Sequence, residues 1–348
     1  MRAVGLSLRS APIPTAGVPG TGGPASTALR HATRALRETH FTIGPAGPAC
    51  RAPCPPWGMD LTSALDGVSV VTVALNLPGP AAAARLGELG ADVVTVLPPA
   101  GDPMATMSPS LYAELHAGQR VVTVDLKSDA GRAEMEKLLA AANVFITSHR
   151  AGALRRLGLD AAAVAARHPR VCQVDIVGFA GERADVPGHD LTYQAESGLL
   201  PVDDAGTPVL PRALVADMHG AEQAVSAALG LLLARGRGGD DAAGGRAQVA
   251  LADAAAAVGL PTRHGLLEPD AILGGATPYY AVYPAAEGHV AVGALEPHSA
   301  EALRTELDLP EGNGDDVAAA LSAALRSRSA RDWQAWGEQR GIPLAEVG

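Results

Sequence analysis

Hydrophobic positions in the first half of this chain fall into two alternating patterns. Short β-branched runs, bounded by Gly, Pro or Asp, predict strands at 68–74, 92–96, 120–125, 144–147 and 171–177. Longer stretches with helical spacing predict helices between them, in an Ala-rich segment that ends at Gly90, at 129–142 and at 151–167. Uninterrupted apolar strands separated by helices are typical of a parallel sheet that is covered on both faces.

The second half of the chain has a different pattern. Two long Ala- and Leu-rich helices are predicted at 217–234 and 248–259, joined by a polar loop at 235–246. Beyond residue 271, short strands are predicted at 279–283 and 289–294, with helices from Ser299 and Val317 onward. The expected fold class is therefore α/β. A Rossmann-like large domain with a mostly parallel sheet would span 59–260, and a smaller α+β domain would span 261–348.

Residues 1–58 differ in composition from the rest of the chain. Pro, Gly, Ser and Ala dominate, arginines recur, and Glu38 is the only acid. Such a segment has too little apolar surface to offset its ordering entropy, so we expect a mostly disordered extension with helical spacing only around 27–37. It resembles a transit peptide, and an extension upstream of a natural start at Met59 explains it equally well. Without an apolar stretch like that of a signal peptide, secretion is not supported.

Charge and cysteine content exclude several classes of function. The formal net charge of −10 argues against a nucleic-acid groove, which needs basic patches. Three cysteines, an odd number in a long chain, argue against a disulfide framework and favour the reducing cytoplasm. Cys50 and Cys54 have no second Cys/His pair at metal-ligand spacing, so no metal is expected. No apolar run reaches the roughly 20 residues that cross a bilayer, so no membrane partner is expected.

Nucleotide cofactors also lack their usual sequence signals. The loop after the first strand, 76–80, reads Asn-Leu-Pro-Gly-Pro and has no G-x-G-x-x-G fingerprint for a nicotinamide or flavin dinucleotide. No G-x-x-x-x-G-K-[ST] loop is present for ATP or GTP. The sequence therefore predicts no tightly bound cofactor.

Three motifs contain side chains suited to proton chemistry. His189 lies in Gly-His-Asp-Leu-Thr-Tyr at 188–193, Asp217 in Val-Ala-Asp-Met at 215–218, and Glu296 in Val-Gly-Ala-Leu-Glu-Pro at 292–297. An imidazole, with an ordinary pKa of about 6.5, and two carboxylates are suited to moving a proton at carbon near neutral pH. Each residue also has an ordinary structural explanation, such as an acid that complements a helix dipole.

The order and spacing of these motifs resemble the class III CoA-transferase family (CaiB/BaiF type), and within it the alpha-methylacyl-CoA racemase branch. The resemblance covers residues 60–348. It implies an acyl-CoA substrate and 1,1-proton transfer at the alpha carbon of a 2-methylacyl thioester. His189 would be the imidazole base and Asp217 the acid or base on the opposite face. Glu296 would orient the imidazole from the second domain, which places the site in an interdomain cleft.

The same resemblance implies how the substrate is held. Lys127, Arg150 and Arg156 match positions that line the CoA-binding crevice, where cations meet phosphates. The Asp190 backbone amide would stabilise the enolate oxygen, and Tyr193 is expected to contact the substrate as well. CoA would enter only as part of this small-molecule substrate. The family also implies an interlocked homodimer.

Two other functions stay open from the sequence. In the transferase branch, the aspartate at the position of Asp217 is a nucleophile that forms an acyl anhydride and then carries CoA. A degenerate protein that binds CoA esters is suggested by departures from the family pattern. Pro98 replaces a charged residue, His149 replaces an aromatic one, the loop at 178–187 is short, and the chain ends without the segment that returns to the large domain.

Overall fold

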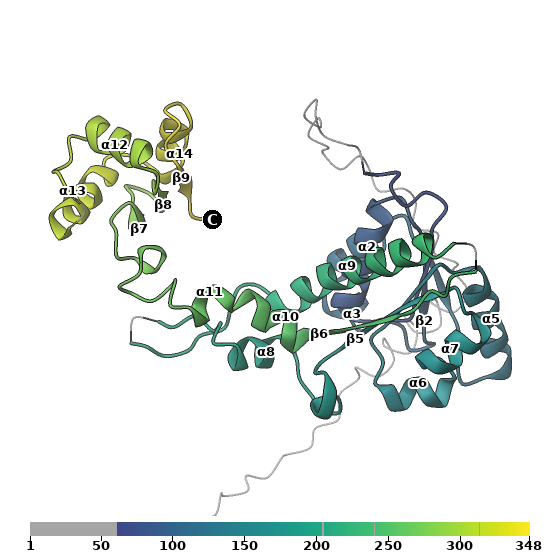
Figure 1. Ribbon diagram of the computed structural model, residues 1–348. Helices are drawn as coiled ribbons and strands as arrows, with labels where there is room; N and C mark the ends of the chain where they lie inside the picture. The colour runs from purple at the N-terminus through teal and green to yellow at the C-terminus, as the bar shows by residue number, and fades with distance from the viewer. Residues whose placement is uncertain (1–60, 204, 240, 313) are drawn as a thin grey trace, which may run out of the picture. The chain divides into compact units, whose positions relative to one another are not determined.

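A computed structural model describes residues 61–203, 205–239, 241–312 and 314–348 (Figure 1). The extension expected over 1–58, its helical segment around 27–37, and Cys50 and Cys54 all lie outside these residues. Cys172, which is described, is a buried free thiol whose Sγ lies 3.3 Å from the Gly244 carbonyl oxygen.

A six-stranded parallel sheet forms the centre of the larger part. Its strands lie in the order β3-β2-β1-β4-β5-β6, and their bounds are β1 Ser69–Thr72, β2 Asp92–Leu97, β3 Arg120–Thr123, β4 Val144–Thr147, β5 Cys172–Val177 and β6 Arg246–Ala250. The expected α/β, Rossmann-like fold class is confirmed. Strand order reverses between β1 and β4, and sheets of this kind bind ligands beyond the carboxyl ends of their strands near that point.

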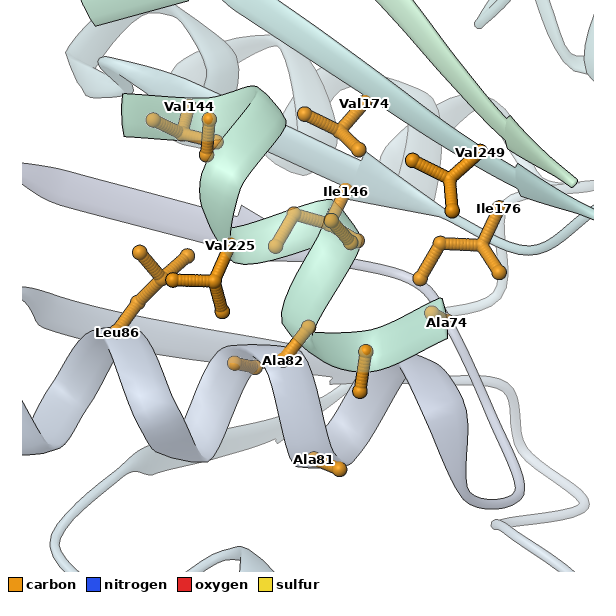
Figure 2. Packing of buried hydrophobic residues seen from close by; sticks show 14 of the residues in the cluster. Ala74, Ala81, Ala82, Leu86, Val144, Ile146, Val174, Ile176, Val225 and Val249 are labelled. Carbon is orange, nitrogen blue, oxygen red and sulfur yellow. The ribbon is translucent and has the colours of Figure 1, made fainter. Parts of the chain in front are cut away.

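Helices cover both faces of the sheet, as Figure 1 shows. One face carries α2 (Pro78–Glu88) and α9 (Val215–Arg237), and the other carries α5 (Asp129–Ala141), α6 (Ala151–Leu157) and α7 (Ala161–Arg167). On the first face, α2 and α9 contact the sheet mainly through alanines. Because these side chains are small, both helices approach the sheet closely. Figure 2 shows Ala81, Ala82, Leu86 and Val225 of these helices against Ala74, Val144, Ile146, Val174, Ile176 and Val249.

The sixth strand was not expected. The segment 235–246 was predicted as a loop and 248–259 as a helix, but β6 occupies Arg246–Ala250 and α10 begins only at Leu251 and ends at Val258. In β6, Val249 pairs with Ile176 of β5 and is buried on the face that α9 covers. Hydrogen bonding to the open edge of β5 outweighs the helical propensity of an Ala-rich segment, which a local pattern does not reveal.

Several short helices complete this part of the chain. Helices α3 (Met104–Met107) and α4 (Pro109–Leu115) lie in a segment for which no helix was predicted. Helix α8 (Asp190–Glu196) begins directly after His189. A further short helix, α11 (Leu260–Arg263), follows α10, and 3₁₀ turns lie at Gly181–Arg183 and Ile272–Gly274.

A separate antiparallel sheet follows in the sequence. It consists of β7 (Tyr280–Pro284), β8 (His289–Gly293) and β9 (Leu344–Glu346), in that order. Helices α12 (Pro297–Glu306), α13 (Asp315–Leu325) and α14 (Ala330–Glu338) pack with it around the buried Trp333. This is the expected α+β arrangement with a core of its own. The domain boundary near residue 260 stays a prediction.

None of the helices in the described part of the chain combines the length and the apolar character needed to cross a bilayer.

Candidate active site

His189 lies at the residue that precedes α8, in extended conformation. Its backbone N–H donates to the Thr192 hydroxyl at 3.0 Å, and that hydroxyl donates to the His189 carbonyl oxygen at 2.8 Å. These two bonds fix where the helix starts, in the manner of a capping box. The side chain of His189 is exposed, so the imidazole is available to a ligand.

Asp190 connects this helix start to the beginning of α9. Its side chain is buried, one carboxylate oxygen accepts the Gln194 side-chain amide, and the other accepts the Asp217 backbone N–H at 3.0 Å. The Gln194 amide also donates to the Ala213 carbonyl oxygen at 2.9 Å. Motifs that lie 27 positions apart in the sequence therefore meet at one place.

Asp217 occupies the first turn of α9 and is partly buried. Burial, followed by the negative charge of Asp190, raises the pKa of its carboxyl to about 6, and the imidazole of His189 acts in the opposite direction. His189 is therefore close enough to influence Asp217 electrostatically. The structure brings together these two residues, which the sequence had nominated from separate motifs.

Tyr193 belongs to the same group of side chains. Its ring packs edge-on against Phe179, with 5.2 Å between the ring centroids. Burial, followed by the charges of Asp217 and Asp190, raises the pKa of its phenol, so the hydroxyl stays protonated at neutral pH. Gly178 and Gly188 give the ring its space, because a Cβ on either would lie within 2.5 Å of a Tyr193 atom.

Gln194 is a site residue that sequence reasoning missed. It lies four positions after Asp190 in α8, a spacing at which helical side chains meet, and that spacing was the available signal. The spacing does not reveal its second bond, to the Ala213 carbonyl oxygen of another segment.

Glu296 lies in the other part of the described chain. It precedes α12 after β8, its side chain is exposed, and its carbonyl oxygen accepts the Ser299 and Ala300 amides at 2.9 and 3.0 Å. This is the strand-end position that the sequence predicted. Its pairing with His189 across an interdomain cleft stays a prediction.

A cavity of about 770 Å³ lies beyond the carboxyl ends of β1 to β4. This volume is within the range of small-molecule sites. Its lining combines apolar residues with cations and polar groups, namely Val73, Val96, Pro98, Pro99, Ala100, Asp125, Leu126, Lys127, Arg132, His149, Ala153, Arg156 and Leu157. The mixture suits a ligand with a flat apolar part and several negative charges.

The cavity contains two of the three cations predicted to bind CoA. Lys127 and Arg156 line it, whereas Arg150, which is exposed at the start of α6, does not. Arg132 and His149 also line it and had not been proposed as binding residues. Burial lowers the pKa of His149, so this imidazole is neutral at physiological pH.

Metal ligation has no visible basis in this region. Within the residues that the structure describes, His, Cys, Asp and Glu side chains form no group of three or more that could hold a metal ion.

Comparison with known proteins gives one family for nearly the whole described chain. The model of CoA-transferase family III matches residues 65–348. Human alpha-methylacyl-CoA racemase is 31% identical over 265 residues, which cover 71% of this chain and 65% of that protein. The succinate–glutarate CoA-transferase of Agrobacterium fabrum is 31% identical over 248 residues, which cover 64% of this chain and 61% of that protein.

Solved structures agree on the fold. A hypothetical protein from Mycobacterium tuberculosis superposes with a TM-score of 0.70 at 24% identity, covering 82% of this chain and 86% of that one. A CaiB/BaiF family protein from Brucella suis gives 0.69 at 24% identity, covering 82% and 84%. This chain spans less than two thirds of the length of the two relatives named above, and they carry different activities to a similar level of identity.

Proposed function

Since the chain belongs to CoA-transferase family III, we propose that it is an acyl-CoA racemase or epimerase that acts by 1,1-proton transfer at the alpha carbon of a 2-methylacyl-CoA-like thioester. One observation carries this choice: an exposed imidazole, His189, acts electrostatically on a partly buried carboxyl, Asp217, whose pKa is raised to about 6. Proton exchange in both directions requires two groups that can each hold or release a proton near neutral pH.

The reaction places one group on each face of the alpha carbon. Neutral His189 takes the alpha proton, and the electrons of the C–H bond move onto the thioester oxygen to give an enolate. Protonated Asp217 then returns a proton to the opposite face, and the reverse reaction exchanges the two roles. The Asp190 amide, at the start of a helix whose first N–H groups have no partner within it, would hold the enolate oxygen. Tyr193 would contact the thioester beside it.

The raised pKa matters for the supply of the acid form. With a pKa of about 6, roughly one Asp217 carboxyl in ten is protonated at pH 7. At the ordinary value of 3.8 the protonated fraction would be about a hundredfold smaller. Burial of this carboxyl therefore makes it a usable proton donor.

The alternative is a class III CoA-transferase that moves CoA between carboxylic acids through an acyl anhydride and a thioester at Asp217. The ionised fraction of Asp217 could serve as that nucleophile. Transfer has no step that requires the imidazole of His189, however, so the presence of His189 beside Asp217 favours racemisation. A degenerate CoA-ester-binding protein is a further alternative.

The 770 Å³ cavity would hold the CoA nucleotide. Lys127 and Arg156 would meet its phosphates, and the apolar lining would pack against the adenine. Arg150, which precedes the first residue of α6 and lies six residues before Arg156, would meet the outer part of CoA. No cofactor beyond the CoA of the substrate is required.

We further propose a homodimer and a cytoplasmic location. Large apolar side chains stay exposed around the site, among them Leu191, Leu210, Leu214 and Met218. A second copy of the chain would cover such surface, and Glu296 would complete the site by orienting His189. Light scattering at micromolar concentration measures the assembly directly, and a mass of one chain would contradict the dimer.

The activity is tested with the separate enantiomers of a 2-methylacyl-CoA in deuterium oxide. Incorporation of deuterium at the alpha carbon with loss of optical purity is expected for the wild type. H189Q and D217N should each abolish racemisation, whereas H264Q, which alters an exposed histidine elsewhere, should not. Passage of CoA to an added free acid that survives H189Q and is lost in D217N would instead establish the transferase. Binding of the CoA ester without either reaction would identify a degenerate CoA-ester-binding protein.

A further inference from the structure

Gln194 has a buried position that its polarity does not explain. Its side chain is 1% exposed, in a short helix that also carries the proposed site residues Asp190 and Tyr193. Burying a side-chain amide is unfavourable unless its hydrogen bonds are made. The amide nitrogen makes two, one to the Asp190 carboxylate and one to the Ala213 carbonyl oxygen at 2.9 Å.

Both bonds lead toward Asp217. Ala213 lies just before α9, so the second bond ties α8 to the segment that enters α9. Asp190 accepts the Asp217 backbone N–H through its other oxygen, at 3.0 Å. Within the part of the chain that the structure describes, the Asp190 carboxylate thus accepts from two neutral N–H donors, which do not neutralise its charge.

We propose that Gln194 is a positioning residue: its amide holds the ionised Asp190 carboxylate against the backbone of Asp217 and so keeps the two acids side by side. The inference rests on the proposed role of Asp217 as proton donor. It adds Gln194 as a residue that maintains the environment of the Asp217 carboxyl. A cation at position 194 would neutralise Asp190, and an apolar side chain would leave it free to turn away, whereas an amide fixes it and preserves its charge.

The effect on Asp217 is electrostatic. The charges that act on its carboxyl come from the start of α8, where Asp190 raises the pKa of Asp217 and His189, the residue before the helix, lowers it. The charge of Asp217 in turn helps to raise the pKa of the Tyr193 phenol in α8. Within the described residues, no charged group of α2, α10, β5 or β6, the other elements packed on α9, acts on this carboxyl. Like charges side by side favour protonation of one partner, so the arrangement adds to the supply of the acid form.

Titration of the Asp217 carboxyl tests this directly. The chain is labelled with ¹³C at the side-chain carboxyls of aspartate, and the Asp217 signal is assigned by its loss in D217N. Q194M retains the approximate shape and removes the amide, and its Asp217 midpoint should fall by about half a unit because Asp190 is no longer held in place. D190N, which removes the charge itself, should lower the midpoint by about one unit. At pH 7, Q194M should then lower kcat about threefold with KM nearly unchanged.

Two comparisons separate positioning from general structural support. E196Q removes another negative charge from α8, where Glu196 pairs with Arg183, and should leave the Asp217 midpoint unchanged. In the D190N background, Q194M should cause no further shift, because Gln194 acts through Asp190. D190N also keeps the test decisive should Q194M not fold, since an unmoved midpoint in D190N contradicts the proposal.

The proposal is overturned if folded Q194M titrates like the wild type, or if Q194M shifts the midpoint equally with and without Asp190. A midpoint that moves as expected in a protein without alpha-deuterium exchange supports the positioning role and removes the proposed activity. The two ideas therefore fail separately.

Discussion

At the scale of single residues, the Asp217 carboxyl links the proposed chemistry to stability. The unfolded chain releases this proton near pH 3.8, whereas the folded chain releases it near pH 6. Between these values the folded state binds more protons than the unfolded state, so stability falls as the pH rises through that window. Above pH 6 the ionised Asp217 carboxyl lowers the free energy of unfolding by its full amount, on the order of 2 to 3 kcal/mol.

D217N should therefore be inactive and more stable than the wild type. We expect a higher urea midpoint at pH 8, with roughly half of the free-energy difference left at pH 5, because the wild-type carboxyl is then mostly protonated in the folded state. The matched control is D253N, which alters an exposed acid in the first turn of α10. A D217N protein that is less stable than the wild type at pH 8 would show that the carboxylate stabilises the fold.

Tyr193 depends on two glycines in distinguishable ways. A Cβ on Gly178 would lie 2.5 Å from the Tyr193 hydroxyl oxygen, whereas a Cβ on Gly188 would lie 2.4 Å from the ring carbon Cε1. G178A and G188A should each destabilise the protein by about 1 to 3 kcal/mol, because the ring must move in a packed interior. Thermal denaturation measures both effects.

The partner substitution Y193F separates the two glycines. It removes the hydroxyl that the Gly178 Cβ would meet, so G178A/Y193F should recover much of the loss relative to Y193F alone. G188A/Y193F should recover nothing, since the ring carbons remain. Equal recovery in the two double variants would mean that the ring does not lie between these glycines.

At the scale of elements, the edge of the parallel sheet is held by one partly buried ion pair. Asp175 of β5 is buried and Arg246 of β6 reaches it with two nitrogens, each 2.6 Å from the same carboxylate oxygen. Gln173 donates to the other oxygen at 2.8 Å. Loss of the arginine leaves a buried carboxylate with only a neutral donor.

R246M should therefore cost about 1 to 3 kcal/mol in free energy of unfolding, moderated because half of the Arg246 side chain is exposed. R85M, which removes the exposed ion pair with Glu88, should cost less than about 0.5 kcal/mol. Urea denaturation compares the two. A similar small loss in both variants would mean that water replaces the arginine at Asp175.

β6 also marks the limit of what the sequence could predict. The first five strands were predictable because each is an apolar run with clear boundaries, and β4 was predicted with its observed bounds, Val144–Thr147. β6 reads Arg-Ala-Gln-Val-Ala, and only its pairing with β5 makes it a strand. The ends of helix α9 were predicted to within a few residues: α9 begins two residues before and ends three residues after the range predicted for it.

The candidate site divides in the same way. His189 and Asp217 could be nominated because their motifs are distinctive, and Lys127 and Arg156 because they match positions of the family that the sequence resembles. Gln194, Arg132 and His149 could not, because their roles depend on side-chain contacts between segments far apart in the sequence. The link from Asp190 to the Asp217 backbone is of the same kind.

At the scale of the whole molecule, the described chain contains two kinds of core that share no residue. Leu86 of α2 belongs to the core of the parallel sheet, and Leu321 of α13 belongs to the core of the antiparallel sheet; both are fully buried. Segments with separate cores unfold as separate cooperative units when few contacts join them. Each core should therefore respond to its own mutations.

Native-state hydrogen exchange measured by mass spectrometry tests this division. L86A and L321A each remove a buried leucine side chain and should lower the local opening free energy by about 2 to 5 kcal/mol. L321A should speed exchange in peptides from β8 and α14 and leave β1 and β4 as in the wild type, and L86A should do the reverse. Because both changes are Leu→Ala at fully buried helical positions, each serves as the control for the other. If either substitution accelerates exchange in both sets of peptides, the chain opens as one cooperative unit and the predicted boundary near residue 260 is wrong.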